Sequence, residues 1–459
     1  MKNGYQGQTK LLNKVILVTI KRLGINGEGI GYYKRKIIFV PGALPHEDVL
    51  ARVVLEKRRY LTGELVHVKK RSKNRVRPVD HYDVGGIELE HLSYPAQLKF
   101  KRDVIKQALK KYHPTGYGKF VIKAAIGMKE PYHYRNKLQF QVRLNKSDQV
   151  IAGLYRPNSH ELVDLPTFST QTDLSMKTIR TICQLINKWR IRPYDERHDA
   201  GCIRTVVIRE SFTTHQLQIV FVSRTRKIPR INNLISDLIA EQPAVVSIMQ
   251  NFNPHRTSLV WGAETTRLYG KEQLVEQIGD VKYHLSARAF FQLNTLQTEK
   301  LYLQIKQALN LQMGDLLIDA YCGAGTIGIY LAHDARAVYG MDLIPESIDD
   351  ARQNAQVAGL TNTHYDVGAA ETLIPKWARE GIIADALVVD PPRTGLDDQL
   401  IETILKYRPA KFVYVSCNPS TLAEDLAALV SVYRVEYIQP LDMFPQTARV
   451  EAVVKLALK

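Results

Sequence analysis

Cysteine is scarce in this chain, which has 459 residues and four cysteines: Cys183, Cys202, Cys322 and Cys417. They are too few and too scattered for a disulfide scaffold, and no Cys-x-x-Cys pair offers the spacing of a zinc site. We therefore expect any cysteine that matters here to act singly.

Long apolar runs are also absent. No run approaches the ~18 residues of a membrane-spanning helix, and the first apolar stretch is broken by Asn13 and Lys14. This predicts a cytoplasmic protein with no membrane contact. The composition, 45% hydrophobic and 24% charged, excludes a disordered or fibrous chain, and the length predicts roughly three domains.

Acidic residues are in the minority, with 46 against 63 Lys and Arg and a net charge of +17. The imbalance is uneven: residues 1–77 hold 18 basic and 5 acidic residues, whereas residues 286–459 hold 15 and 21. A basic front joined to a mildly acidic back indicates that one part binds a polyanion, nucleic acid first, while another does something else. A basic surface that only keeps the protein soluble is the alternative.

The front segment reads as a small all-β barrel or sandwich of about 60 residues. Short apolar runs at 15–21, 36–40, 49–55 and 63–69 are separated by glycine and proline. The run Gly27-Glu-Gly-Ile-Gly31 is followed by β-branched and aromatic residues, which favours a hairpin over a phosphate loop. Residues 69–77 hold six basic residues in nine positions and predict a linker or a phosphate-contacting arm.

The middle, residues 78–285, mixes both periodicities and predicts an α+β domain. Helices are expected at 94–112 and 174–190, and strands at 138–144, 203–209, 216–223 and 245–251. This part carries no motif that chemistry alone can interpret.

The back third alternates strand, glycine turn, helix and strand, the pattern of a doubly wound parallel sheet. After an apolar strand at 316–320 comes Gly323-Ala-Gly325-Thr-Ile-Gly328, and a second strand, 337–341, ends at Asp342. Such glycines allow a ligand close to the backbone, and Asp342 is placed to accept ribose hydroxyls. The fingerprint fits NAD and S-adenosylmethionine about equally, and a ligand-free packing turn is the bland alternative.

Two further strands of this region run into reactive residues. Asp390-Pro-Pro-Arg393 follows one, and Cys417 follows the strand at 411–416, ahead of a helix that Ser420 is expected to cap. Cys417 near a helix N-terminus predicts a favoured thiolate and nucleophilic catalysis, whereas a random cysteine is by default a small buried hydrophobe. Cys322, inside the glycine turn, is interpreted as packing.

Six motifs in order give the chain its resemblance to a known family. They are Tyr134-Arg-Asn-Lys-Leu-Gln139, Ser286-Ala-Arg-Ala-Phe-Phe-Gln-Leu-Asn294, Tyr321-Cys-Gly-Ala-Gly325, Asp390-Pro-Pro-Arg393, Ser416-Cys-Asn-Pro419 and Phe444-Pro-Gln-Thr-Ala-Arg-Val-Glu451. Together they resemble the RNA uridine-5 methyltransferases, and the front segment is similar to the TRAM domain, a small RNA-binding β-barrel. The resemblance implies a multidomain α/β protein: a TRAM-like barrel at 8–68, a central RNA-binding α+β domain at 78–285 and a Rossmann-like methyltransferase domain at 286–459.

The resemblance also implies the site residues and the cofactor, S-adenosylmethionine. Cys417 would add to carbon 6 of uracil, and Glu451 would be the general base that removes the proton from carbon 5. The expected cofactor contacts are Gln292, Tyr321, Gly323, Gly325, Asp342 and Asp390. Asp390 is also expected to take part in catalysis at the uracil edge, and Arg393 to bind phosphate or orient its loop. The target uridine would be flipped out of its stack or taken from a loop.

One departure from the family concerns metal. Many relatives carry an iron-sulfur cluster on four cysteines, three of them around a Cys-Gly-Gly-Cys stretch, where this chain has Val84-Gly-Gly-Ile87. No cysteine stands near residues 165–166 either, where the fourth is expected. Because iron-sulfur ligation needs thiolates, we predict no cluster and no metal, with hydrophobic packing in its place.

The substrate expected from the resemblance is 23S ribosomal RNA, with the T-loop uridine of transfer RNA as the alternative. A TRAM-like front domain with a long basic central domain favours ribosomal RNA, because the smaller transfer-RNA enzymes are expected to lack the front barrel. A non-catalytic RNA-binding assembly factor and a small-molecule methyltransferase are the readings from other classes. The presence of Cys417 and Glu451 argues against the assembly factor. The basic front segment argues against a small-molecule methyltransferase. We expect a monomer.

Overall fold

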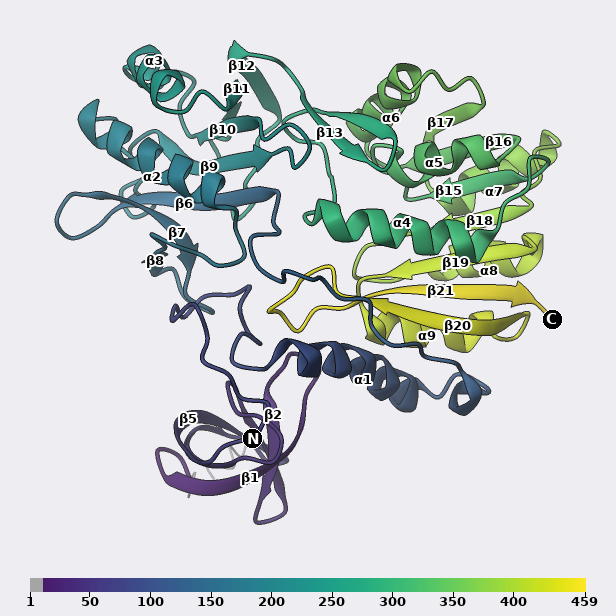
Figure 1. The fold of residues 1–459 in the computed structure, drawn as a ribbon, viewed down its shortest axis with the longest axis horizontal. Helices are drawn as coiled ribbons and strands as arrows, with labels where there is room; N and C mark the ends of the chain where they lie inside the picture. Colours follow the sequence, from purple (N-terminus) through teal and green to yellow (C-terminus); the bar gives the residue numbers. More distant parts are fainter. Residues whose placement is uncertain (1–10) are drawn as a thin grey trace, which may run out of the picture.

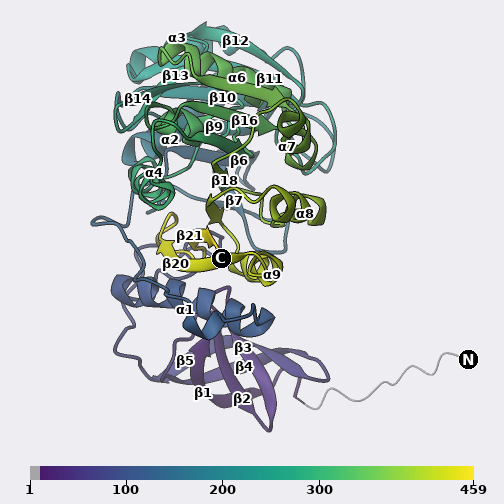
Figure 2. The same ribbon diagram turned by 90° about the vertical axis from the view of Figure 1, so that its right-hand side faces the viewer.

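The computed structural model describes residues 11–459 and shows three bodies (Figures 1 and 2). A small barrel lies at one end, a long helix separates it from the C-terminal sheet, and a second sheet lies at the other end. Residues 8–10 of the predicted barrel lie outside the described residues.

The barrel is closed, in the strand order β1-β2-β3-β5-β4. Its strands are β1 (Val15–Leu23), β2 (Gly29–Tyr33), β3 (Lys36–Val40), β4 (Asp48–Glu56) and β5 (Tyr60–Lys70). Buried and exposed residues alternate along β1, as the sequence pattern requires. Gly31 faces β1 so closely that a Cβ there would lie 2.4 Å from Val18 Cγ1. The predicted barrel and its glycine hairpin are confirmed.

The segment after the barrel is fixed to it by a buried carboxylate. Glu47 is fully buried, and its oxygens accept hydrogen bonds from the backbone of Leu44 and Ser72 and from the guanidinium of Arg75 at 2.6 and 2.7 Å. These hydrogen bonds, with Arg75 the largest of the favourable contributions, lower the pKa of Glu47 despite its burial. The basic run at 69–77 is therefore docked on the barrel at Arg75.

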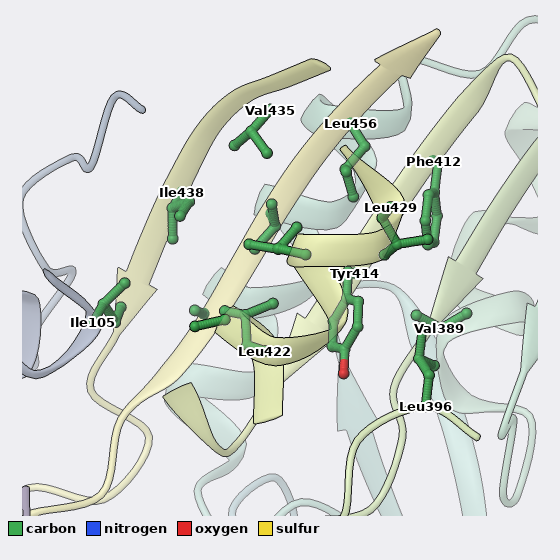
Figure 3. Packing of buried hydrophobic residues seen from close by; sticks show 14 of the residues in the cluster. Ile105, Val389, Leu396, Phe412, Tyr414, Leu422, Leu429, Val435, Ile438 and Leu456 are labelled. Atoms are coloured by element: carbon green, nitrogen blue, oxygen red, sulfur yellow. The ribbon is translucent and has the colours of Figure 1, made fainter. Parts of the chain in front are cut away.

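Helix α1 (Tyr94–Tyr112) joins the barrel to the C-terminal body. Its Phe100, Val104 and Ile105 pack in one buried cluster with Leu422 of α9 (Pro419–Leu429) (Figure 3). Each such side chain stabilises the junction by about 1.5–3 kcal/mol. The helix predicted at 94–112 is confirmed, and it packs on the C-terminal sheet layer (Figure 2).

The central sheet has seven strands, antiparallel except for the pair β10 and β11. In order they are β12 (Glu264–Gly270), β11 (Val245–Phe252), β10 (Leu217–Ser223), β9 (Ile203–Glu210), β6 (Lys137–Leu144), β7 (Val150–Tyr155) and β8 (Leu162–Asp164). Helices α2 (Asp173–Lys188) and α3 (Ile231–Glu241) cover one face. A short 3-10 helix, η1 (Tyr117–Lys119), follows α1 before the chain enters this sheet. After the sheet, the hairpin of β13 (Leu274–Ile278) and β14 (Val281–Leu285) leads into the C-terminal body.

The C-terminal sheet also has seven strands, and its first five are parallel. In order they are β17 (Thr363–Val367), β16 (Ala337–Asp342), β15 (Leu316–Ala320), β18 (Ala386–Val389), β19 (Lys411–Ser416), β21 (Glu451–Leu458) and β20 (Tyr433–Leu441). One face carries α4 (Thr295–Leu309), α5 (Thr326–Leu331) and α6 (Pro345–Val357), with the short helix η2 (Ala332–Asp334) directly after α5. The other face carries α7 (Ala370–Arg379), α8 (Asp398–Tyr407), α9 and α1. The predicted doubly wound domain is confirmed.

No helix in residues 11–459 is long and apolar enough to span a membrane.

Candidate active site

The glycine loop follows β15 and adopts a backbone that side chains disfavour. Tyr321, Gly323 and Gly325 have φ angles of 64°, 53° and 75°. A Cβ on Gly323 would meet nothing within 4 Å, whereas one on Gly325 would lie 3.0 Å from Ala351 Cβ. Gly323 therefore borders open space and Gly325 a packed helix, the two uses expected of glycines in a nucleoside-binding turn.

Asp342 holds this loop from the end of β16. One carboxylate oxygen accepts a hydrogen bond from Gly323 N at 3.1 Å, and the other from Ile344 N at 2.9 Å. The carboxylate is half-buried, and the next two side chains, Leu343 and Ile344, are exposed. The structure thus places the predicted acid beside the predicted glycine turn.

A buried acid beneath the loop was not predicted from the sequence. Asp319 on β15 is inaccessible, and burial raises its pKa to about 7. Its carboxylate accepts a hydrogen bond from Gly328 N at 2.8 Å, which fixes the first turn of α5. Because β15 pairs in parallel with both β16 and β18, the glycine loop, Asp342 and the Asp390 loop all lie at the same edge of the sheet. In the sequence, Asp319 stands inside a short hydrophobic strand, and no motif marks it as a residue of the site.

Gln292 is held in place from the central sheet. Asn136, in the motif before β6, donates from Nδ2 to the carbonyl of Gln292 at 2.8 Å and to Thr295 Oγ1 at 3.0 Å. Its backbone N–H also donates to Leu293 O at 2.9 Å. Two motifs that are more than 150 residues apart therefore form one junction, and Phe290 beside it is 63% exposed.

Asp390, Cys417 and Glu451 lie on three neighbouring strands of the C-terminal sheet. Asp390 follows β18, Cys417 follows β19, and Glu451 begins β21. Ser416 pairs with Ala452 in the antiparallel register of β19 and β21, which places Cys417 opposite Glu451. Asp390 is half-buried and Glu451 is 3% exposed. The structure brings together the three residues predicted to act in catalysis.

The electrostatics of this trio correct one prediction. Burial, with the nearby carboxyls of Glu451 and Asp390, raises the pKa of the Cys417 thiol to about 12. The prediction of a favoured thiolate, made from the helix N-terminus, is therefore wrong for the free protein.

The helix after Cys417 is capped by Asn418, whose side chain accepts a hydrogen bond from Ser420 N at 3.1 Å. The prediction that Ser420 is the cap is therefore also wrong.

The two carboxyls are also shifted. Burial raises the pKa of Asp390 to about 7, and burial with repulsion from Asp390 raises the pKa of Glu451 well above its ordinary value. Raised pKa values at neighbouring carboxyls are a feature of many acid–base sites.

Arg393 counteracts the shift at Cys417. Its guanidinium lowers the pKa of the thiol, though by less than burial and the two carboxyls raise it. Arg393 is exposed, and its carbonyl accepts from Asn418 Nδ2 at 2.8 Å. The Asp-Pro-Pro-Arg loop is thereby joined to the turn that carries Cys417. Cys322 is buried, in agreement with its interpretation as packing.

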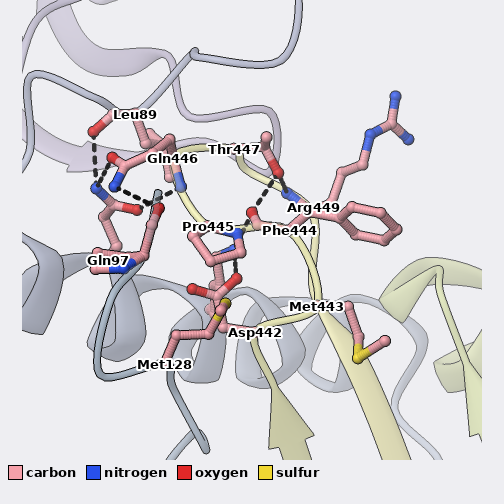
Figure 4. A network of polar contacts seen from close by, with 12 residues as sticks. Leu89, Gln97, Met128, Asp442, Met443, Phe444, Pro445, Gln446, Thr447 and Arg449 are labelled. Atoms are coloured by element: carbon pink, nitrogen blue, oxygen red, sulfur yellow. Dashed lines mark hydrogen bonds and ion pairs between the residues drawn. The ribbon is translucent and has the colours of Figure 1, made fainter. Parts of the chain in front are cut away.

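The loop before Glu451 is held by a polar network (Figure 4). The Lys101 ammonium of α1 forms a fully buried ion pair with Asp442 and donates to Phe444 O at 2.9 Å. Gln97 Nε2 donates to Gln446 Oε1 at 2.8 Å, and Gln446 N donates back to Gln97 Oε1 at 3.0 Å. Helix α1 therefore positions the loop that ends at Glu451, a role that its sequence did not reveal.

The region where relatives carry cluster cysteines is held by packing and by two acids. Val84, Leu165 and Phe168 share the central core, as the prediction of hydrophobic packing requires. Asp80 and Glu90 are also buried, and they accept from Ser169 N at 2.8 Å and Ser169 Oγ at 2.7 Å. Packing alone was therefore an incomplete prediction. Residues 11–459 contain no group of three or more His, Cys, Asp or Glu side chains that could hold a metal.

Comparisons with known proteins agree with this architecture. Residues 258–459 match the family model described as tRNA (Uracil-5-)-methyltransferase, and residues 10–66 match the TRAM domain. An uncharacterized RNA methyltransferase from Lactiplantibacillus plantarum is 53% identical, over 95% of this chain and 91% of its own length. One from Enterococcus faecalis is 51% identical, over 97% and 98%.

The chain belongs to the uracil-5 RNA methyltransferase family. A solved relative, the tRNA (uracil-54, C5)-methyltransferase of Pyrococcus abyssi in complex with S-adenosyl-L-homocysteine, has 27% identity and a TM-score of 0.78. The match covers 96% of this chain and all of that one, so it includes the front barrel. The expectation that transfer-RNA enzymes lack the barrel is therefore wrong for this member of the family, and the barrel does not separate the two RNA classes.

Proposed function

We propose that this protein transfers a methyl group from S-adenosylmethionine to carbon 5 of a uridine in 23S ribosomal RNA, through a covalent bond to Cys417. The observation that carries the covalent chemistry is the register of β19 and β21, which sets Cys417 opposite Glu451 with Asp390 on the next strand. We also propose that the enzyme works as a monomer in the cytoplasm, where it meets this RNA.

The glycine loop fits the proposed cofactor. The space above Gly323 admits a nucleoside close to the backbone, and the Asp342 carboxylate is fixed where ribose hydroxyls can donate to it. Tyr321, Gly325 and Gln292 complete the proposed contacts. When bound, the cofactor supplies an electrophilic methyl group on a sulfonium. The complex of the Pyrococcus abyssi relative with S-adenosyl-L-homocysteine supports this assignment.

The first role of the protein is to make carbon 5 nucleophilic. The Cys417 thiol passes its proton to the ionised Asp390 carboxylate, and Sγ bonds to carbon 6 of uracil. The electron pair of the 5,6 double bond moves into the ring carbonyl, and the resulting enolate carbon 5 takes up the methyl group. Arg393 favours the thiolate during this step, since its guanidinium lowers the pKa of Cys417.

The second role is to release the product. Carbon 5 still carries its proton after methylation, and the Glu451 carboxylate removes it while the bond between carbon 6 and Sγ breaks. The thiolate recovers its proton from Asp390, and the proton on Glu451 passes to solvent. Burial and repulsion from Asp390 raise the pKa of Glu451, so its ionised form is a stronger base than an ordinary carboxylate.

RNA reaches the site from the basic part of the chain. The front 77 residues carry a net charge of +13, whereas residues 286–459 carry −6, so the phosphate backbone is bound mainly outside the methyltransferase domain. Exposed Phe290 lies two residues before Gln292 and offers an aromatic face on which the flipped uracil can stack.

Transfer RNA is the second candidate substrate, favoured by the Pyrococcus abyssi relative, whose substrate is tRNA uracil-54. The test is transfer of labelled methyl to total RNA from cells lacking this protein, followed by separation of the RNAs and digestion to nucleosides. Label in 5-methyluridine of the large ribosomal RNA is expected. Label in transfer RNA overturns the RNA class and keeps the chemistry, and label in neither overturns both in favour of an RNA-binding assembly factor.

A further inference from the structure

A pocket opens beside Cys417, on the side of the barrel and of helix α1. The pocket has a volume of about 210 Å³. Its lining from the catalytic domain is Arg393, residues 417–420 at the start of α9, and residues 448–450 before β21. Val104 of α1, Glu88, and Ile25 and Asn26 of the barrel complete the lining. Neither Asp390 nor Glu451 lines it. Of the three residues predicted to act in catalysis, only Cys417 therefore reaches this pocket.

The barrel residues in this pocket come from the turn between β1 and β2, residues 24–28. Ile25 is 48% exposed and Asn26 is exposed, although both line the pocket. Gly24 N donates to Glu28 O at 2.8 Å and Gly27 N to Gly24 O at 3.0 Å, so the turn is closed by its own backbone. Its two outward side chains are an apolar group and an amide.

The turn is held against the catalytic domain. Gly27 has a φ of 86°, and a Cβ there would lie 2.7 Å from Leu89 Cδ2 and 3.5 Å from Ala448 Cβ. Leu89 N donates in turn to Gln446 O at 2.8 Å. At the base of the same hairpin, Leu23 is buried in the cluster that contains Phe100 and Val104. The position of the turn beside Cys417 is thus fixed by packing on both sides.

The chemistry of the lining fits one nucleotide. The guanidiniums of Arg393 and Arg449 are exposed and suit a phosphate, and Figure 4 shows the Arg449 side chain extending away from the polar network. Ile25 and Val104 offer apolar contact to a base. The Asn26 amide and the Glu88 carboxylate can bond its edge, and the carboxylate favours a base with an amino group.

We infer that this pocket holds the nucleotide next to the target uridine, and that Ile25 and Asn26 of the barrel make the enzyme selective for an amino-bearing base at that position. The inference rests on the proposed function, because it takes the uridine bonded to Cys417 as its reference point. It gives the barrel a role in choosing the site in addition to supplying charge.

The first experiment measures kcat/KM for methyl transfer to RNA hairpins that contain one target uridine and each of the four bases on either side of it, with the methylated position mapped by mass spectrometry. The wild type should prefer an amino-bearing base over uridine by about tenfold at one of the two positions. Ile25→Ala and Asn26→Ala should each reduce this preference several-fold. The matched control is Leu17→Ala, an exposed apolar residue of the same barrel that does not line the pocket, and it should keep the preference.

The second experiment does not depend on turnover. Cys417→Ala is irradiated with the same hairpins carrying 6-thioguanosine next to the uridine, and the cross-linked peptide is identified by mass spectrometry. Cross-links within residues 24–28 or at Glu88 are expected. Unchanged selectivity in both barrel variants, or cross-links only elsewhere, overturns the pocket assignment even when methyl transfer is normal. A wild type that methylates none of the hairpins and no cellular RNA overturns the proposed function instead.

Discussion

The two large sheets of this protein have seven strands each but contribute differently to the candidate site. The C-terminal sheet is parallel over five strands, so several strands end at the same edge, and Asp342, Asp390 and Cys417 all lie there. The central sheet is largely antiparallel, so its strand ends are divided between two edges. It contributes to the site through Asn136, directly before β6, and Arg209 of β9, which donate hydrogen bonds to the carbonyls of Gln292 and Ala289. The parallel sheet thus brings the reactive side chains to one edge, and the central sheet holds a loop beside them in place.

The largest expected effect comes from the parallel sheet. Glu451→Gln removes the proposed base while keeping the shape of the side chain, so turnover should fall about 10³-fold. Methylated RNA should remain covalently attached to the protein, which denaturing gels and intact mass spectrometry detect. Glu436→Gln, on the adjacent strand β20, removes a carboxylate that is ion-paired with Arg434 and Lys455 and should leave turnover unchanged. A Glu451→Gln enzyme that releases its product at the normal rate would give Glu451 another role.

The junction between the bodies should show a large effect on stability. Lys101→Met leaves Asp442 as a buried carboxylate without its cation, which costs about 3–5 kcal/mol of folding free energy in urea melts. Adding Asp442→Leu should restore most of the loss, because the pair is then replaced by apolar groups. If the single and double variants melt alike, the pair does not stabilise the junction.

The pH dependence of methyl transfer should reflect the ionisation of Asp390 at the edge of the parallel sheet. Burial raises the pKa of Asp390 to about 7, so below pH 7 this group is protonated and cannot accept the thiol proton. We expect kcat/KM to rise about tenfold per pH unit below a midpoint near 7 and to level off above it. Asp390→Asn should lower activity and remove the inflection. An unchanged profile in that variant would assign the inflection to another group.

A substitution at the central sheet should reduce methyl transfer the least. Asn136→Ala removes the donor for two acceptors beside Gln292, at a cost of about 1–3 kcal/mol in stability, and should weaken methyl transfer about tenfold, mainly through KM for the cofactor. Lys146→Ala, in the exposed turn after β6, is the matched control and should behave as wild type. A loss in Asn136→Ala as large as that in Glu451→Gln would contradict the division of roles between the two sheets.

The sequence predicted the parts of this molecule that depend on local pattern. Alternating apolar residues and glycine turns identified the barrel, and strands that run into Gly323, Asp390 and Cys417 identified the chemical edge of the parallel sheet. Each of these signals lies within about ten residues, where periodicity and turn chemistry decide the structure.

The rest could not be predicted because it depends on contacts between distant segments. Lys101 on α1 looks like an ordinary solvated lysine until Asp442 is placed beside it, 341 residues away. The pKa of Cys417 was predicted in the wrong direction because the helix N-terminus is visible in the sequence, whereas burial and the facing Glu451 are not. The contact of Gly27 with Ala448 is likewise visible only in the assembled structure.

The central claim is that Cys417 forms the covalent bond to uracil, and trapping tests it most directly. RNA with 5-fluorouridine at the target position has no proton on carbon 5 for Glu451 to remove, so the wild type should stop after methyl transfer. The account predicts a methylated RNA adduct on the peptide that contains Cys417, and no adduct in Cys417→Ala. An adduct on another residue, or full turnover by Cys417→Ala on unmodified RNA, would contradict it.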